Sequence, residues 1–193
     1  MKTHPAHDAS EAPALILTTS WGEIRIAARC GKIIACTLPF RDGEAEFQGL
    51  EKKAPPISKD WKHVKITGSD ISGAPYALDR KVLLTAENFV KSLLAGRDAR
   101  RPPVRLPEAA DFTTLTWREM MKIPFGQTRA YGDLAAAAGR PRAARAAGTA
   151  CATNQIPLFV PCHRILGTGG ALGGFSSGLA WKKYLLRCEG SRP

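Results

Sequence analysis

The amino-acid sequence predicts an α+β fold, in which a small antiparallel-sheet domain with helices is followed by a mostly helical domain containing a helix-turn-helix. Short runs rich in β-branched residues dominate the beginning of the chain, whereas the second half carries apolar residues at helical spacing. A charged segment that ends in two prolines, residues 96–103, separates these parts and is typical of a linker. We therefore predict two domains, at residues 1–102 and 103–193.

The first domain is expected to contain three strands, at residues 14–19, 22–28 and 33–38, with tight turns around Gly22 and Gly31. Residues 1–12 are polar and are predicted to form a loose leader. Residues 43–59 are charged and contain prolines, which predicts a loop with some helix. Residues 78–94 place leucine, phenylalanine and valine at helical spacing, so we expect a helix that ends at Gly96.

The second domain is expected to contain helices at residues 112–122, 131–138, 141–150 and 178–187. Asp111 is the expected N-cap of the first of them, and Pro141 is expected to open the third. The second and third helices, joined by a tight turn at Gly139, have the form of a helix-turn-helix. A helical hairpin that only packs the core has the same pattern. Small residues in the third helix favour the helix-turn-helix, because only its arginines, Arg142 and Arg145, project far from the backbone.

The charge of the chain predicts a polyanionic partner. The net charge is +11, and residues 101–193 hold 13 of the 28 Lys and Arg residues but only 5 of the 17 Asp and Glu residues. Nucleic acid is the commonest partner of such a basic region, although a basic surface that serves only solubility has the same composition.

The expected compartment is the cytoplasm, with association with the nucleoid if the chain is bacterial. No apolar run approaches the roughly 20 residues that cross a bilayer, and the N-terminus lacks the apolar centre of a signal peptide. The five cysteines form an odd set without framework spacing, which indicates free thiols in a reducing compartment.

One cysteine stands out by its neighbours. An apolar run leads to Pro161, Cys162, His163 and Arg164. A cysteine in an apolar segment is usually structural, but His163 and Arg164 are polar where a core strand would continue apolar. A base and a positive charge near Cys162 are expected to lower the pKa of its thiol and to favour the nucleophilic thiolate.

A glycine-rich segment, residues 167–178, follows this cysteine. Such a segment lets backbone N–H and C=O groups approach a flat ligand closely, and a flexible surface loop is the alternative interpretation.

Residues 112–189 resemble the O6-alkylguanine-DNA alkyltransferases, also called methylated-DNA–protein-cysteine methyltransferases, in the order and spacing of their motifs. The motifs are Pro-Phe-Gly at 124–126, Tyr-Gly-Asp-Leu-Ala at 131–135, Ala-Ala-Arg-Ala at 143–146, Pro-Cys-His-Arg at 161–164, Gly-Gly-Phe-Ser at 173–176 and Gly-Leu-Ala at 178–180. The resemblance implies a monomeric DNA-repair protein that flips O6-alkylguanine out of double-stranded DNA and transfers the alkyl group irreversibly to its own cysteine, once per molecule and without a cofactor.

The resemblance also implies a role for each matching residue. In the catalytic centre, Cys162 is the expected alkyl acceptor, and His163 the base that acts on it through a water. Glu189 is expected to orient His163, and Asn154 to hold the hinge between the recognition helix and the acceptor segment. Tyr131 is expected to assist rotation of the target nucleotide and to hydrogen-bond the purine.

The remaining roles concern DNA and the flipped base. Arg145 is expected to insert into the duplex, with Arg142 and Arg164 as further DNA contacts. Backbone groups of Cys162, Ile165 and Ser176 are expected to read the guanine edge, beside Phe175, which stands where some family members carry tyrosine. The family binds the minor groove with its helix-turn-helix.

The chain departs from the family at Gln155, where proline is usual, so a looser hinge is expected. Some relatives bind zinc in the first domain. We predict no metal here, because Cys30 and Cys36 have no clear paired histidine and because His4 and His7 lie in the loose leader.

Three other functions remain open from the sequence. A non-catalytic relative that binds alkylated DNA usually has the acceptor cysteine replaced, whereas Cys162 is present. A helix-turn-helix transcription factor would not need Pro161, His163, Glu189 and the glycine-rich segment together. A cysteine hydrolase would turn over and would require an oxyanion hole.

Overall fold

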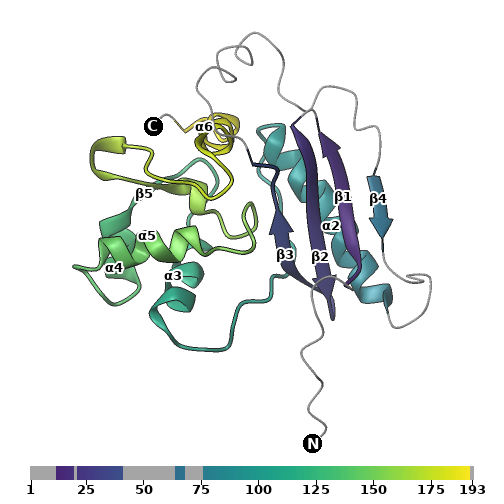
Figure 1. Cartoon of the computed structure of the whole chain (residues 1–193), viewed down its shortest axis with the longest axis horizontal. Coiled ribbons are helices and arrows are strands. Elements are labelled where there is room, and N and C mark those ends of the chain that lie inside the picture. The colour runs from purple at the N-terminus through teal and green to yellow at the C-terminus, as the bar shows by residue number, and fades with distance from the viewer. Residues whose placement is uncertain (1–11, 20, 41–63, 68–75, 192–193) are drawn as a thin grey trace, which may run out of the picture.

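The computed structural model describes residues 12–19, 21–40, 64–67 and 76–191. A four-stranded sheet backed by a long helix lies on one side of the molecule, and a group of shorter helices lies on the other (Figure 1). The predicted α+β class is confirmed.

The sheet is antiparallel, with the strand order β3-β2-β1-β4. Its strands are β1 (Ala14–Thr19), β2 (Gly22–Arg29), β3 (Lys32–Thr37) and β4 (Val64–Thr67). The first three match the predicted strands within a residue or two. The four-residue β4 was not predicted, because a strand so short carries too little alternation to be recognised. The predicted loop at 43–59 and leader at 1–12 fall almost entirely outside the described residues.

Helix α2 (Ala77–Leu94) packs across one face of the sheet. Its apolar stripe, which includes Leu83, Phe89 and Leu93, is buried against strand residues such as Ile26. The side chain of Asp79 also accepts a hydrogen bond from the N–H of Gly31, at 2.6 Å, and so ties the helix to the β2–β3 turn.

The edge strand β3 connects the sheet to the rest of the chain. Ile33 exchanges backbone hydrogen bonds with Pro103 and Arg105, at 2.9 and 2.8 Å, and the N–H of Cys36 donates to the carbonyl of Gln155 at 2.9 Å. One cluster of buried apolar residues runs from the sheet through α2 to the C-terminal helices. The boundary at residue 102 remains a prediction.

The second half of the chain holds four helices, two short strands and two 3-10 helices. The helices are α3 (Phe112–Met120), α4 (Tyr131–Ala137), α5 (Ala144–Ala152) and α6 (Leu179–Cys188); the strands are β5 (Arg129–Ala130) and β6 (Ile165–Leu166), which pair in parallel; the 3-10 helices are η3 (Cys162–Arg164) and η4 (Thr168–Gly170). Asp111 caps α3 as predicted, because its side chain accepts from the N–H of Thr114 at 2.8 Å.

The start of α5 corrects the sequence prediction. Helix α4 ends before Gly139, whose φ of +85° suits a helix stop, but the turn continues through Pro141 and Arg142. Helix α5 therefore begins at Ala144 rather than at Pro141, and Arg142 lies in the turn instead of on the helix. A proline at the first helical position is common, but here it belongs to the turn.

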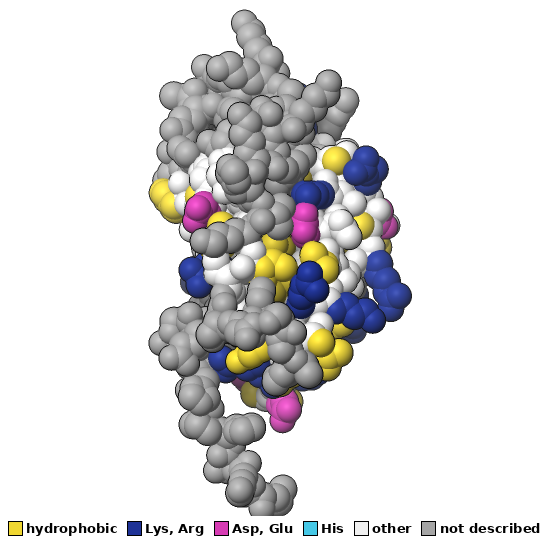
Figure 2. All heavy atoms as spheres, turned by 90° about the vertical axis from the view of Figure 1, so that its right-hand side faces the viewer, with side chains coloured by type: hydrophobic (Ala, Val, Ile, Leu, Met, Phe, Trp, Pro, Cys, Tyr) yellow, Lys and Arg dark blue, Asp and Glu magenta, His cyan; other side chains and the backbone are white. Residues whose placement is uncertain are grey.

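The described helices include none that is both long and apolar enough to span a membrane. Basic side chains lie among hydrophobic and acidic ones on the β4 side of the molecule, which Figure 2 shows. The basic character is therefore not confined to the helical half.

Candidate active site

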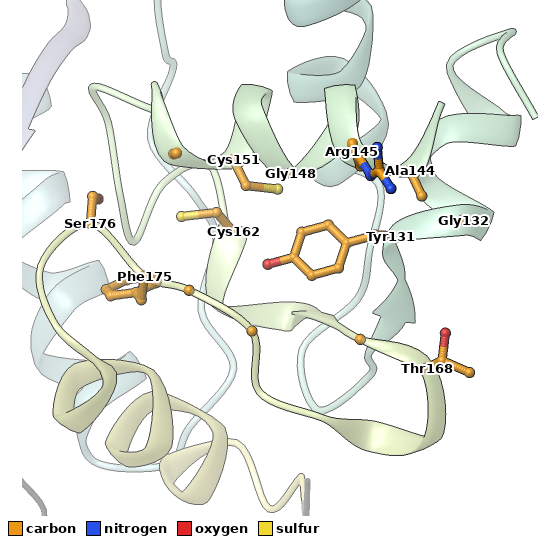
Figure 3. A pocket seen from close by; sticks show the side chains of 14 residues that line it. Tyr131, Gly132, Ala144, Arg145, Gly148, Cys151, Cys162, Thr168, Phe175 and Ser176 are labelled. Atoms are coloured by element: carbon orange, nitrogen blue, oxygen red, sulfur yellow. The ribbon is translucent and has the colours of Figure 1, made fainter. Parts of the chain in front are cut away.

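Cys162 begins η3 and lies in the wall of a cavity of about 710 Å³. The side chain is 3% exposed, so the thiol is reached through this cavity rather than from the open surface. The cavity is also lined by Tyr131, Arg145, Cys151, Phe175 and Ser176 and by several glycines. Figure 3 shows the Cys151 and Cys162 side chains reaching the same part of it, with the Tyr131 hydroxyl pointing to their side.

Asn154 holds the thiol. Its amide Nδ2 donates to Cys162 Sγ at 3.1 Å and to the carbonyl of Val160 at 2.8 Å, while its Oδ1 accepts from the N–H of Ile156 at 3.0 Å. These bonds tie the end of α5 to the segment that leads to Cys162. Asn154 thus contacts the Cys162 thiol directly, and its role as a hinge stays a prediction.

The expected lowering of the Cys162 pKa does not occur in this structure. Burial raises the pKa of the thiol, and the hydrogen bond from Asn154 and the charge of Lys182 only oppose that effect. The environment of a buried cysteine disfavours the thiolate unless a base removes the proton. The site therefore needs a base at the moment of reaction.

His163 is placed to supply that base. It is fully buried, and its Nε2 lies 2.9 Å from Glu189 Oε1. Burial lowers the pKa of His163, although Glu189 opposes this, so the ring is neutral near pH 7. Its Nδ1 is buried and makes no hydrogen bond to the described residues, which makes it the nitrogen that can accept a proton.

Glu189 is the centre of a buried ion pair behind His163. Arg164 donates from Nε to Glu189 Oε2 at 2.9 Å and from Nη2 to Oε1 at 2.8 Å. Burial alone would raise the pKa of Glu189, but the hydrogen bonds from His163 and Arg164 outweigh it and lower that pKa to about 2. Glu189 therefore remains charged and fixes the orientation of the imidazole.

The placement of Arg164 corrects the prediction that it contacts DNA. The residue is only 3% exposed, and its Nη1 donates to the carbonyl of Ile123 at 2.6 Å while the rest of the guanidinium faces Glu189. Because Pro161 and η3 turn the chain inward, successive side chains leave the segment in different directions. Cys162 faces the cavity, and Arg164 faces the interior.

Lys182 is a site residue that sequence reasoning missed. It is fully buried on α6, and its Nζ donates to the carbonyls of Ile165, at 2.6 Å, and of Leu172. The same Nζ lies 5.7 Å from the centre of the Tyr131 ring. Burial lowers the pKa of Lys182 to about 8, while the nearby Cys162 opposes that shift. Lys182 therefore holds the glycine-rich segment against β6 and brings positive charge to the thiol.

A signal for Lys182 was present in the sequence. It stands three residues before Leu185 and four before Leu186, on the buried stripe of α6. A lysine on an apolar helix face is rarely buried without a specific partner. The neighbouring Lys183 hides this signal, because a pair of lysines is usually interpreted as a solvated surface.

Lys182→Met is expected to raise the pKa of the Cys162 thiol further, because it removes the one nearby cation that lowers it. The readout is the rate of iodoacetamide labelling of Cys162 against pH, followed by peptide mass spectrometry, with Lys183→Met as the matched control. An unchanged labelling profile in Lys182→Met would show that the charge does not reach the thiol.

Tyr131 and the glycine-rich segment line the same cavity as Cys162. A Cβ on Gly173 would lie 3.0 Å from the Tyr131 hydroxyl, so only glycine allows this close approach. Burial, with Cys151 and Cys162, raises the pKa of Tyr131 to about 12, so its hydroxyl stays protonated and can donate a hydrogen bond. Phe175 and Ser176, from the same segment, also line the cavity.

Three residues that were predicted to contact DNA or the guanine base do not lie next to the Cys162 thiol. Arg145 is exposed and lines the cavity, at the far end of the Tyr131 ring from the cysteines (Figure 3). Arg142 is exposed but does not line it. Ile165 is buried and does not line it either, and its carbonyl accepts from Lys182.

No group of three or more potential metal ligands occurs in the described part of the chain. Cys30 is exposed and Cys36 is buried, and both are free thiols. His4 and His7 lie outside the described residues, so the absence of a zinc site stays a prediction.

Glu189 is expected to make the free energy of unfolding decrease at low pH. Its pKa is about 2 in the folded protein, below the ordinary value of 4.5, so its contribution to the free energy of unfolding is full above pH 4.5. That contribution is lost as the pH falls through about 2. Urea unfolding of the wild type and Glu189→Gln across this range checks the prediction: the stability difference should shrink toward low pH, and a constant difference would contradict it.

The part of the chain that holds this site is similar to known proteins. Residues 111–191 match the model of the 6-O-methylguanine DNA methyltransferase, DNA binding domain. A methylated-DNA–protein-cysteine methyltransferase of Methanosarcina acetivorans is 46% identical over 85 residues, which are 44% of this chain and 54% of the relative. The enzyme of that name from Salmonella typhimurium is 48% identical over 79 residues, 41% of this chain and 46% of the relative. The match thus spans about half the length of these relatives.

A solved structure extends the likeness to the whole fold. The Mycobacterium tuberculosis OGT in complex with DNA superposes with a TM-score of 0.65 at 26% identity, over 90% of each chain. A structure of the M. tuberculosis O6-methylguanine methyltransferase gives a TM-score of 0.64 at 26% identity and covers 92% of this chain and 93% of that chain. By its matched domain and its fold, the chain is similar to the O6-alkylguanine-DNA alkyltransferases.

Proposed function

We propose that this protein repairs DNA by transferring the alkyl group of a flipped-out O6-alkylguanine to Cys162, irreversibly and once per molecule. The observation that carries the proposal is the position of Cys162 in the wall of a cavity of about 710 Å³. The next two residues, His163 and Arg164, form a buried network with Glu189. Relatives that match about half of their length to this chain are named methylated-DNA–protein-cysteine methyltransferases.

The cavity suits one extruded base. An alkyl group on a guanine oxygen cannot be reached inside the base stack, so the nucleotide must leave the duplex at a cost of a few kcal/mol. The Tyr131 ring and the backbone of Gly173 provide a flat wall for the purine, and the protonated Tyr131 hydroxyl can donate to one of its ring nitrogens. Backbone groups around Cys162 and Ser176 are the proposed readers of the guanine edge.

The chemistry is a single displacement. His163 takes the thiol proton of Cys162 through a water at Nδ1, while Glu189 stabilises the imidazolium that results. The thiolate forms a new S–C bond to the alkyl carbon as the bond from that carbon to guanine O6 breaks. Guanine leaves with the electron pair of the broken bond and regains a proton. The product is a thioether without a good leaving group, so the protein is consumed and no cofactor takes part.

DNA is the proposed partner, bound in its minor groove by the helix-turn-helix of α4 and α5. Arg145 projects from the exposed side of α5 at the rim of the cavity, where an inserted side chain can fill the stack that the base has left. Arg142, in the preceding turn, is placed for a phosphate contact. We propose a cytoplasmic, monomeric protein, associated with the nucleoid if it is bacterial.

Arg145→Ala is expected to slow repair of duplex DNA by about 10- to 100-fold, because the vacated stack is no longer filled. Repair of the same base in a single-stranded oligonucleotide should change little, since no base has to be extruded. The measurement is single-turnover transfer on both substrates, with the exposed Arg105→Ala as control. An equal loss on both substrates would contradict the insertion role.

The experiment that tests the function uses duplex DNA with one labelled O6-methylguanine. The label is expected on the protein, rising to a plateau of one per molecule. A plateau well above that value would indicate turnover and a hydrolase, and DNA binding without any transfer would indicate the non-catalytic relative. That alternative is less favoured, because Cys162 and its network are intact.

A further inference from the structure

A second cavity, of about 260 Å³, lies behind the acceptor segment. It is bounded by the end of α2, the linker and residues 121–125 after α3. The short helix η3 contributes Cys162 to the first cavity and Arg164 to the second. No residue of α4 or α5 lines this second cavity, so it is separate from the proposed DNA-binding helices.

Positive side chains outnumber acidic ones in its lining. The cationic residues are Arg97, Arg101, Lys122 and Arg164, and the acidic residue among them is Asp98. Lys122 is paired with Glu119 at 2.5 Å, and Arg164 with Glu189. Arg97 and Arg101 together carry two positive charges, and Asp98 is the one acidic residue in the lining that can offset them. The cavity therefore has a net positive charge.

Arg101 is held in place with part of its guanidinium lacking a partner. Its Nη1 donates to the carbonyl of Met121 at 2.9 Å, and its Nε is buried without a hydrogen bond to any described residue. Burial and the nearby Arg164 lower the pKa of Arg101, against the smaller effects of Asp98 and Glu189. An anion in the cavity would offset the excess charge of Arg97 and Arg101, which both line it.

We propose that this cavity binds a small phosphate-type oxyanion, either inorganic phosphate or a phosphomonoester, through Arg101 and Arg97. Arginine pairs closely with phosphate because its planar guanidinium presents parallel N–H groups to two oxygens. The volume admits a phosphate group but not a stacked nucleobase pair. Because Arg164 lines the same cavity and donates to Glu189, the bound anion would lie beside the network that serves Cys162.

The probe is inorganic phosphate, titrated at constant ionic strength against chloride and followed by calorimetry and by the midpoint of thermal unfolding. Saturable binding is expected, with a matching rise in the midpoint. Arg97→Gln and Arg101→Gln should each weaken phosphate binding by about tenfold, which is typical for one charged hydrogen bond. Arg100→Gln is the matched control, because Arg100 is exposed in the same segment and does not line the cavity.

Arg101→Gln could fail to fold because Arg101 is partly buried. Arg97 is exposed, so Arg97→Gln should fold and still test the cavity. Equal phosphate affinity in the wild type, Arg97→Gln and Arg100→Gln would overturn the proposal, as would a response that does not saturate. A second experiment, binding to undamaged duplex DNA, distinguishes a small phosphate ligand from the phosphates of the DNA backbone. If Arg97→Gln weakens binding to an undamaged duplex relative to Arg100→Gln while phosphate binding is unchanged, the cavity serves the DNA backbone and the proposal is wrong.

Discussion

Cys162→Ala is expected to abolish alkyl transfer from O6-methylguanine while the protein still binds the alkylated duplex. The substitution removes the nucleophile but leaves exposed Arg142 and Arg145 unchanged. The loss should be complete within detection, because Cys151 is a poor substitute: burial, then the nearby Cys162, raises the pKa of its thiol to about 12. Transfer is measured as label on the protein after one hour with excess DNA.

Cys151→Ser is the matched control, since Cys151 lines the same cavity and also carries a thiol. It should retain transfer at one alkyl group per molecule. If Cys162→Ala still accepted the label, or if Cys151→Ser lost it while folded, the acceptor would have been assigned to the wrong cysteine.

Glu189→Ala is expected to lower the free energy of unfolding by about 3–5 kcal/mol, the usual effect of removing one partner of a buried ion pair. Three groups lose their acceptor: the His163 ring, the Arg164 guanidinium and the N–H of Gly126, which donates to Glu189 Oε2 at 3.2 Å. The Arg164 charge then remains buried without its counter-ion. Urea unfolding at neutral pH measures the change.

Glu119→Ala is the control for this prediction, because its salt bridge with the exposed Lys122 should contribute at most about 1 kcal/mol. Glu189→Ala should also slow transfer in any fraction that remains folded, since His163 loses its orientation. A loss of stability as small as that of Glu119→Ala would show that Arg164 finds another partner.

Local patterns in the sequence were enough to predict most of the fold. Alternating β-branched residues and the turn glycines predicted β1, β2 and β3, and helical spacing predicted α2 and α6 within a residue or two. The start of α5 was predicted wrongly, because Pro141 is equally suited to a helix start and to a turn. Only tertiary packing decides between these positions.

The candidate site was predicted through its motifs rather than its geometry. Cys162 and His163 were first noticed from their neighbours, Glu189 was identified by resemblance, and the structure brings His163 within 2.9 Å of Glu189. Arg164 was predicted to contact DNA, and only the fold shows that it is buried and faces Glu189. The direction of the Cys162 pKa was also missed, since sequence neighbours say nothing about the extent of burial.

The most direct test of the account is to locate the transferred group on the protein. After reaction with duplex DNA containing one O6-methylguanine, the protein is digested and its cysteine peptides are analysed by tandem mass spectrometry. The account predicts one methyl group per molecule, on the peptide that contains Cys162. Methyl on Cys151, the other cysteine lining the cavity, or protein that remains unmodified while the DNA is repaired, would contradict it.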